Sequence, residues 1–408
     1  MNKVLILTDG KAGHENQSRA FARALGCEPV LLPVQFKSPL AKALSYLLDL
    51  FGILTIKVFK DFKVLNALKV PNHPTDPKDL NDPTDLKDLT PPTDPKDLPP
   101  PTDPKDPKDL KDPNNPKDLK DLKDLKAVLG TGSGTFYAAK TIARRLGVPC
   151  GVVLYPRGYR LAGFDCILAP SFDRPDNVPN VIPIPANLVA NDDAFYEAGV
   201  KAFRERYTPS DRPAVAVIVG GPNKCATLSA DWMRAQLEQI FAKYKPSWQG
   251  EGALPTPNLP AAAPQHQTTQ PPSHEIWVTT SRRTPPDVEA VVDSFPFDYK
   301  LLYSKDHFNP IPAFVSLVRV LYVTAESTGM LSEACTFGTA EVHALDNLKS
   351  GPHKFRRFID DLTSAGHLDG ARKIDLSEQF ARARQLLKIN LSDRASERTR
   401  NERGGENR

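Results

Sequence analysis

The chain has few cysteines, and none are spaced to form a disulfide framework or a zinc site. Its 408 residues include five cysteines, at positions 27, 150, 166, 225 and 335, with no C-x-x-C pair. Such frameworks need paired or closely spaced cysteines. His14-Glu15 also lacks a second His four residues after the first, so the zincin metal motif is absent. We therefore expect reduced, mostly buried thiols and no metal site.

Long hydrophobic runs are missing as well. No stretch reaches the roughly 18 uninterrupted apolar residues of a membrane-spanning helix. The apolar run Val4–Leu7 is followed closely by Asp9, which makes it too short for a secretory signal. These absences predict a cytoplasmic protein and leave open a peripheral contact with a membrane.

Proline, by contrast, is abundant and unevenly placed. Of 40 prolines, 14 fall in residues 71–126 together with 14 aspartates and 10 lysines, so the rest of the chain is more basic than the formal net charge of +4. Dense proline removes helix donors, and such a composition cannot bury a core. We predict disordered inserts at 71–126, with a short helix at 118–126 as an option, and at 246–273. A disordered tail is predicted at 391–408.

Short apolar runs alternate with helical patterns in the remainder, which is typical of parallel α/β domains. Two such domains are predicted, over 1–207 and 208–390. The first helix is expected at 16–25. The Leu-rich segment 40–59 is interpreted as a buried helix, and a membrane-surface or lipid-acceptor face is the alternative.

In the first domain, the segment Asp9–Gln17 follows a predicted strand and combines two glycines with several polar side chains. Free backbone N–H groups at the start of a helix favour an anion, and His14 is a candidate general base. Helix capping alone is the competing interpretation. Gly130–Thr135 lacks both the P-loop lysine and the last glycine of a dinucleotide fingerprint, so it either lines a ligand site or packs strand against helix.

In the second domain, Gly220–Lys224 and Ser281–Thr284 follow successive predicted strands and are expected to lie side by side. Paired glycines allow close approach of a phosphate, and Arg282 with Arg283 could clamp a diphosphate. A third segment, Glu326–Ala334, begins a helix. There Glu326 could accept hydrogen bonds from ribose hydroxyls while Ser327 faces phosphate; a Ser327 cap with ordinary packing is the alternative.

Four segments in this order resemble a known family: Thr8–Gln17, Gly220–Lys224, Thr279–Pro285 and Thr324–Ala334. The family is named for the plant elongated-mitochondria fission factor, and many of its bacterial members are described as glycosyltransferases. The likeness covers most of 1–70 and 127–365, and the two proline-rich inserts fall between the matching segments.

The resemblance implies an α/β fold with two Rossmann-like domains facing across a cleft, as in GT-B glycosyltransferases. The implied donor-binding residues are Gly220, Gly221, Asn223, Lys224, Ser281, Arg282, Arg283, Glu326, Ser327, Met330, Ser332 and Glu333. The implied catalytic residues are His14, Asp9 and Glu15, and the acceptor side would comprise Gly10, Lys11, Gly13, Asn16, Gln17, Gly132 and Ser133. No cofactor or metal is implied.

The function so implied is transfer of a sugar from a nucleotide-sugar donor to a cell-envelope glycan or lipid acceptor, with no nucleic-acid partner. The alternative is a non-catalytic GT-B-like scaffold that recruits partners, as in mitochondrial fission. An NAD-dependent sugar epimerase is disfavoured, because the fingerprint is absent and Tyr137 and Lys140 have the wrong spacing for a Tyr-x-x-x-Lys pair.

Overall fold

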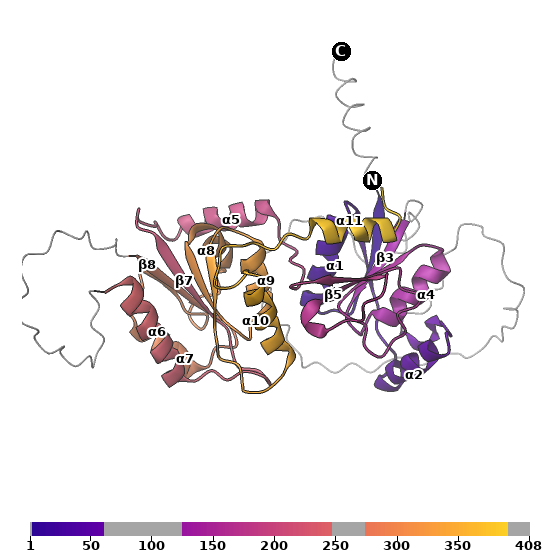
Figure 1. Cartoon of the computed structure of the whole chain (residues 1–408), viewed down its shortest axis with the longest axis horizontal. Helices are drawn as coiled ribbons and strands as arrows, with labels where there is room; N and C mark the ends of the chain where they lie inside the picture. The colour runs from indigo at the N-terminus through magenta and orange to yellow at the C-terminus, as the bar shows by residue number, and fades with distance from the viewer. Residues whose placement is uncertain (1, 61–124, 247–273, 391–408) are drawn as a thin grey trace, which may run out of the picture.

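Two parallel β-sheets organise the protein, whose computed structural model describes residues 2–60, 125–246 and 274–390 (Figure 1). The predicted inserts and tail lie almost wholly outside these ranges. The exceptions are Pro246, the first residue of the second predicted insert, and Leu125 and Lys126, the last two of the first, which begin a strand. The fold class predicted from the sequence, α/β with two Rossmann-like domains, is confirmed by the two sheets.

The first sheet has six strands in the order β2-β1-β3-β4-β5-β6, all parallel. The strands are β1 (Lys3–Thr8), β2 (Glu28–Pro33), β3 (Leu125–Thr131), β4 (Cys150–Val153), β5 (Cys166–Pro170) and β6 (Val181–Ile184). The helices that follow the first three strands along the chain include α1 (Ala12–Ala24), α2 (Pro39–Leu50) and α4 (Phe136–Leu146). Because β1 and β3 are neighbours, the turns that follow them meet at one edge of the sheet.

The second sheet has five parallel strands in the order β11-β10-β7-β8-β9. They are β7 (Ala214–Val219), β8 (Glu275–Thr280), β9 (Tyr299–Leu301), β10 (Val320–Thr324) and β11 (Glu341–Leu345). Its helices are α6 (Ala230–Tyr244), α7 (Pro286–Ser294), α8 (Ile311–Leu317), α9 (Thr328–Thr336) and α10 (Lys354–Ser364). The central β7 lies between β10 and β8, so three predicted site segments converge there.

Local sequence signals set several helix ends. The hydroxyl of Ser229 accepts from the backbone N–H of Trp232 at the start of α6. Gly147 ends α4 in the left-handed conformation, with φ of 67°. Helix α1, however, begins at Ala12 and not at Asn16. Most of the segment predicted as the loop 9–17 therefore forms the first turns of a helix.

Two helices pack against the sheet of the other half of the chain. Helix α5 (Asp193–Arg204) precedes the predicted boundary at residue 208, yet its Tyr196 and Phe203 pack in the core of the second sheet. Helix α11 (Ser377–Leu386) follows the second sheet and lies over the first (Figure 1), where Ala383 and Leu387 join the core around Phe21. The chain thus crosses between the two halves twice.

The prediction of a buried helix over residues 40–59 is wrong. Helix α2 ends at Leu50, and a short 3-10 helix, η1 (Ile56–Val58), follows. The residues that α2 buries are the polar Ser45 and Asp49, whereas most of its leucines are exposed. Asp49 is held inward by an ion pair with Lys140 on α4, at 2.8 Å, which turns the apolar face outward.

Candidate functional site

The turns after β1 and β3 lie in direct contact. A Cβ built on Gly132 would lie 2.3 Å from Cε1 of His14, and one on Gly134 would lie 2.5 Å from an Asp9 carboxylate oxygen. Gly132 also has φ of 80°. Glycine is therefore required at 132 both for the backbone conformation and for the His14 ring above it. The structure thus brings together the predicted catalytic residues Asp9 and His14 with the predicted acceptor-side Gly132.

Asp9 orients His14. Nδ1 of His14 lies 3.1 Å from both carboxylate oxygens of Asp9, and Nζ of Lys11 lies 3.3 Å from one of them. Burial on its own would raise the pKa of Asp9, but the His14 charge and the hydrogen bonds from His14 and Lys11 lower it overall, below its ordinary 3.8. With Nδ1–H turned to Asp9, Nε2 carries the lone pair that can take a proton.

The other predicted residues of this region have varied surroundings. Glu15 accepts from the hydroxyl of Thr8 at 3.2 Å and pairs with Arg19 at 2.8 Å, which favours a role in fixing the start of α1. Gly10, Gly13 and Asn16 are exposed, and a Cβ on either glycine would meet no neighbour. The side-chain oxygen of Gln17 is buried and has no hydrogen-bond partner in the described part of the chain.

Sequence reasoning missed two polar contacts here. Ser18 on α1 bonds to Thr131 at the end of β3, with 2.7 Å between the hydroxyl oxygens. Nζ of Lys42, on α2, donates to the hydroxyl of the predicted Ser133 at 2.9 Å. The first contact joins two residues 113 positions apart, so only the strand order could have revealed it.

On the second sheet, Glu326 holds the turn after β7. Its Oε1 accepts from the backbone N–H of Gly221 at 2.8 Å and from the hydroxyls of Thr324 and Ser327, each at 3.0 Å. Its Oε2 accepts from the side-chain amide of Asn347 at 2.7 Å, a partner that the sequence analysis did not identify. Glu326 is only 3% exposed. These bonds favour a structural role for Glu326, and its contact with a ribose stays a prediction.

The two glycines of this turn pack against protein atoms. A Cβ on Gly220 would lie 2.0 Å from Oε1 of Glu326, and one on Gly221 would lie 2.2 Å from the carbonyl oxygen of Arg283. The hydroxyl of Thr284 donates to the carbonyl of Gly220 at 2.7 Å. The turns after β7, β8 and β10 are therefore one connected unit. The sequence analysis predicted that the first two of them lie side by side.

Arg282 and Arg283 are exposed at the carboxyl edge of β8. Neither guanidinium has an ion-pair or hydrogen-bond partner among the described residues. The backbone N–H of Arg283 donates to the hydroxyl of Ser281 at 3.3 Å, which fixes the turn that carries both side chains. Asn223 and Lys224 lie in the neighbouring turn, where the side-chain oxygen of Asn223 accepts from the backbone of Cys225.

Three predicted donor residues lie on α9, and two of them bond to the segment that connects β6 to α5. The hydroxyl of Ser332 accepts from the backbone N–H of Asn187 at 3.2 Å. Oε1 of Glu333 accepts from Tyr196 at 2.9 Å and from Asn191 at 3.2 Å. Burial raises the pKa of Glu333, against the lowering effect of these two hydrogen bonds. Met330, the third of these residues, is half-buried.

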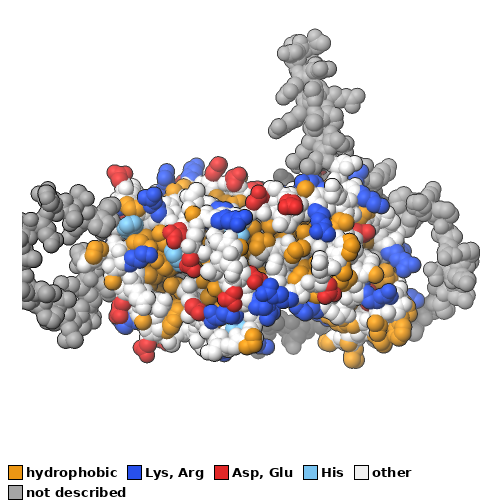
Figure 2. All heavy atoms as spheres, viewed as in Figure 1, with side chains coloured by type: hydrophobic (Ala, Val, Ile, Leu, Met, Phe, Trp, Pro, Cys, Tyr) orange, Lys and Arg blue, Asp and Glu red, His pale blue; other side chains and the backbone are white. Residues whose placement is uncertain are grey.

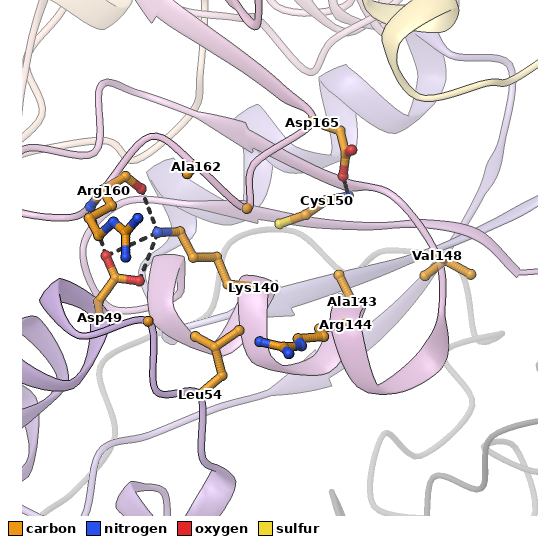
Figure 3. Close-up of a pocket in the computed structure, with 12 residues that line it drawn as sticks. Asp49, Leu54, Lys140, Ala143, Arg144, Val148, Cys150, Arg160, Ala162 and Asp165 are labelled. Atoms are coloured by element: carbon orange, nitrogen blue, oxygen red, sulfur yellow. Dashed lines mark hydrogen bonds and ion pairs between the residues drawn. The ribbon is translucent and has the colours of Figure 1, made fainter. Parts of the chain in front are cut away.

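A separate pocket of about 340 Å³ lies between α2, α4 and the start of β4 and β5 (Figure 3). Lys140 reaches across it to Asp49, with Nζ–O distances of 2.8 and 3.0 Å, and also donates to the carbonyl of Arg160. Burial lowers the pKa of Lys140, although Asp49 opposes this. None of the predicted site residues lines the pocket. No group of three His, Cys, Asp or Glu side chains suited to a metal occurs in the described ranges.

Two Rossmann-like sheets with glycine-containing turns at their carboxyl edges define a two-domain α/β protein of the kind that binds ligands at those edges. The chain belongs to the mitochondrial fission ELM1 family, whose model matches residues 12–251 and 258–399. This finding confirms the resemblance seen in the sequence. No curated protein matches the chain significantly.

Solved structures with a similar fold include glycosyltransferases and an epimerase. MurG of Acinetobacter baumannii is 15% identical, with a TM-score of 0.40 over 95% of this chain and 92% of that one. UDP-GlcNAc 2-epimerase of Neisseria meningitidis, bound to UDP-GlcNAc, is 13% identical, with a TM-score of 0.46 over 96% and 100%. Phytolacca americana UGT2, with UDP-2fluoro-glucose and pterostilbene, is 12% identical, with a TM-score of 0.42 over 97% and 99%. At such identities each is a likeness of fold alone.

Proposed function

We propose that the protein is a glycosyltransferase that moves a sugar from a nucleotide-sugar donor to a cell-envelope glycan or lipid acceptor. The observation that carries this proposal is the Asp9–His14 pair at the carboxyl edge of the first sheet, with Nδ1 of His14 3.1 Å from Asp9. An imidazole oriented by a carboxylate is a suitable general base near neutral pH. The family membership supports the same reaction class.

The acceptor side would be the surface around His14. The His14 side chain is 23% exposed, so part of the imidazole ring faces solvent. Loss of the acceptor hydroxyl proton to Nε2 would create a positive imidazolium, which the Asp9 carboxylate stabilises. Lys11 and the N–H groups at the start of α1 add positive potential that favours an acceptor carrying phosphate.

The donor side would be the turns after β7 and β8. Arg282 and Arg283 supply two guanidinium groups without partners in the described residues, beside the turn Gly220–Gly221. In the proposed step the acceptor oxygen forms a bond to the anomeric carbon while the bond from that carbon to the diphosphate breaks. The electron pair leaves with the nucleoside diphosphate, whose added charge the two arginines would stabilise.

Thermal unfolding in the presence of nucleoside diphosphates tests the donor site. We expect UDP or another nucleoside diphosphate to raise the Tm of the parent protein and to have no effect on Arg282→Ala/Arg283→Ala. Arg319→Ala is the matched control, since this exposed arginine lies at the amino end of β10, on the opposite edge of the sheet. An absence of any shift with every nucleoside diphosphate would refute the donor assignment.

The alternative is a non-catalytic scaffold, favoured by one set of observations. Glu326, Ser332 and Glu333, which the sequence analysis assigns to donor binding, are committed to bonds within the protein. A His14→Gln variant separates the two functions. A transferase would lose its turnover, by about 10²–10⁴-fold for loss of a general base, while keeping its fold and Tm. A scaffold would keep its biological effect.

A further inference from the structure

Helix α2 carries apolar side chains on its outward face as well as against the core, where Ala41, Tyr46 and Leu48 pack. Its inward face carries Ser45, which bonds to the Tyr159 hydroxyl at 3.0 Å, and Asp49, which pairs with Lys140. Its outward face carries leucines. An apolar stripe on a helix ordinarily faces the core, because burial of apolar surface drives folding. The outward stripe therefore indicates that something other than water covers α2 in the working protein.

The exposed apolar side chains are concentrated at this one place. Six of the seven large hydrophobic side chains that the described residues expose lie between positions 40 and 53, each 45% to 81% exposed. They form the α2 patch: Leu40, Leu44, Leu47, Leu50, Phe51 and Ile53. Figure 2 shows them as an orange surface at the position of α2 in Figure 1. Such a contiguous patch marks an interaction site.

Most charged side chains around the α2 patch are basic, although exposed Asp165 lines the adjacent pocket. Exposed Lys57 and Lys60 follow it in the chain, and exposed Arg160 lies against it, with Nη1 3.5 Å from the carbonyl of Leu50. Arg144 lines the adjacent pocket (Figure 3). The only acidic residue between positions 36 and 60 is Asp49, which is buried and neutralised by Lys140. An apolar surface with a cationic border complements an anionic lipid surface.

We propose that the α2 patch docks the protein on the surface of an anionic phospholipid bilayer, with α2 lying in the plane of the interface. This mode needs no spanning segment, and no helix in the described ranges is long and apolar enough to cross a bilayer. Leu44, Leu47 and Leu50 would enter the boundary between headgroups and acyl chains, while Lys57, Lys60 and Arg160 contact lipid phosphates.

A second copy of the chain is a poorer occupant. A helix of twelve residues such as α2 is about 18 Å long and about 10 Å wide, so it presents roughly 200 Å². A stable dimer buries about 800 Å² on each partner. A bilayer imposes no such minimum, because affinity grows with each inserted side chain and each cation near the surface.

The docked orientation would serve the proposed acceptor site. Lys42 in α2 donates to Ser133 at 2.9 Å, and the neighbouring Gly132 lies under the His14 ring. The α2 patch and the candidate base therefore belong to one continuous region of the first domain. Membrane docking at the α2 patch would therefore place the proposed acceptor site near a lipid surface, and that part of the inference rests on the proposed function. The docking itself does not depend on sugar transfer.

Flotation of the full chain with lipid vesicles tests the docking. We expect binding to vesicles that contain phosphatidylglycerol, weak binding to phosphatidylcholine alone, and a decrease with added salt. Leu47→Ser/Leu50→Ser should weaken binding by tenfold or more, on the order expected for two inserted leucines. Phe195→Ser is the control, since Phe195 is the one large exposed apolar residue outside the patch among those described.

The cationic border is tested separately. Lys57→Ala/Lys60→Ala should lower the affinity for phosphatidylglycerol vesicles about 30-fold, at about 1 kcal/mol per lysine near the surface. The control pair, Lys201→Ala/Lys354→Ala, removes two exposed lysines from α5 and α10, which pack on the second sheet, and should leave the affinity unchanged. Arg282→Ala/Arg283→Ala should also bind vesicles normally, so a failed donor site and a failed docking surface are distinguishable.

A direct readout of insertion completes the test. Phe51→Trp should show a blue-shifted emission and quenching by lipids with brominated chains, both absent without vesicles. The proposal is overturned if the full chain fails to float with any anionic vesicle. It is also overturned if Leu47→Ser/Leu50→Ser changes the sedimentation of the free protein from dimer to monomer and leaves flotation unaltered, because the patch would then be a subunit interface.

Discussion

Gly132 determines the position of His14. Its positive φ of 80° and the 2.3 Å approach of a built Cβ to Cε1 of His14 leave no room for another residue. Gly132→Ala should therefore displace the His14 ring. It should lower the free energy of unfolding by clearly more than about 1–2 kcal/mol, which is the cost of placing alanine in the left-handed conformation. The matched control is Gly147→Ala, whose φ is 67° but whose Cβ would meet nothing. Chemical denaturation of both variants measures the difference, and equal losses would contradict the assigned contact.

Glu333 gives a pH-dependent prediction. Burial raises its pKa in the folded protein above the ordinary 4.5, so the folded state holds the proton more tightly than the unfolded chain. The parent protein therefore loses stability as the pH rises from about 4.5 through the folded pKa. Glu333→Gln lacks this titration and keeps an oxygen for Tyr196 and Asn191. As the pH rises through this window, the parent should lose free energy of unfolding and the variant should not. At pH 7 the variant should therefore be the more stable of the two.

A second outcome of Glu333→Gln bears on the donor site. If Glu333 serves only the contacts with Tyr196 and Asn191, nucleoside diphosphate binding should survive the change. A loss of binding with an intact fold would favour its predicted role on the donor side.

Residue roles were predictable from the sequence only where a strand order could be inferred. Asp9, His14 and Gly132 were singled out separately, and the parallel β1–β3 pairing explains why they meet. The fully bonded state of Glu326 could not be predicted, because Asn347 lies beyond β11, which has no clear signal in the sequence. The sequence alone does not tell whether a glutamate such as Glu326 is buried or exposed.

At the scale of elements, one ion pair fastens α2 to α4. Lys140 is only 2% exposed at its side chain and is bonded to both oxygens of Asp49. The backbone N–H of Arg160 also donates to Asp49, at 2.7 Å. Lys140→Met would leave the buried carboxylate with this one donor among the described residues, and should lower the free energy of unfolding by about 3–5 kcal/mol. The double variant Lys140→Met/Asp49→Leu should lose less than the sum of the single variants. Urea denaturation measures this coupling, and strict additivity would contradict it.

The same ion pair shows what a hydrophobic pattern can and cannot predict. The leucines of 40–50 correctly predict a helix, but the period alone does not say which face meets the protein. That choice depends on Ser45 and Asp49, whose partners Tyr159 and Lys140 are roughly one hundred residues away. Local capping signals depend less on distant partners, since Ser229 at the start of α6 and Gly147 at the end of α4 act through their own backbone neighbours.

At the scale of the whole molecule, tandem βα repeats were sufficient to predict two parallel sheets. They did not predict that the C-terminal helix α11 returns to pack on the first sheet. Beyond residue 338 the sequence analysis assigned no element, whereas the structure has β11, α10 and α11. Helix α11 is mostly polar, and its contribution to the first domain comes from a few apolar residues near its end. Its packing partner is a sheet that begins more than three hundred residues earlier, which no local pattern can reveal.

Leu387 offers a test of the packing between the end of α11 and the first sheet. It is 1% exposed and approaches Gly151 on β4, where a built Cβ would lie 3.2 Å from its Cδ1. Leu387→Ala should destabilise the first domain by about 2–5 kcal/mol, the cost of a large-to-small change in a core. Hydrogen exchange should then quicken in β4 and β5, before any change in β7 and β8. Leu386→Ala, at a half-buried position next to it, should have a smaller effect. If exchange quickened first in the second sheet, α11 would instead be stabilising the half of the chain from which it comes.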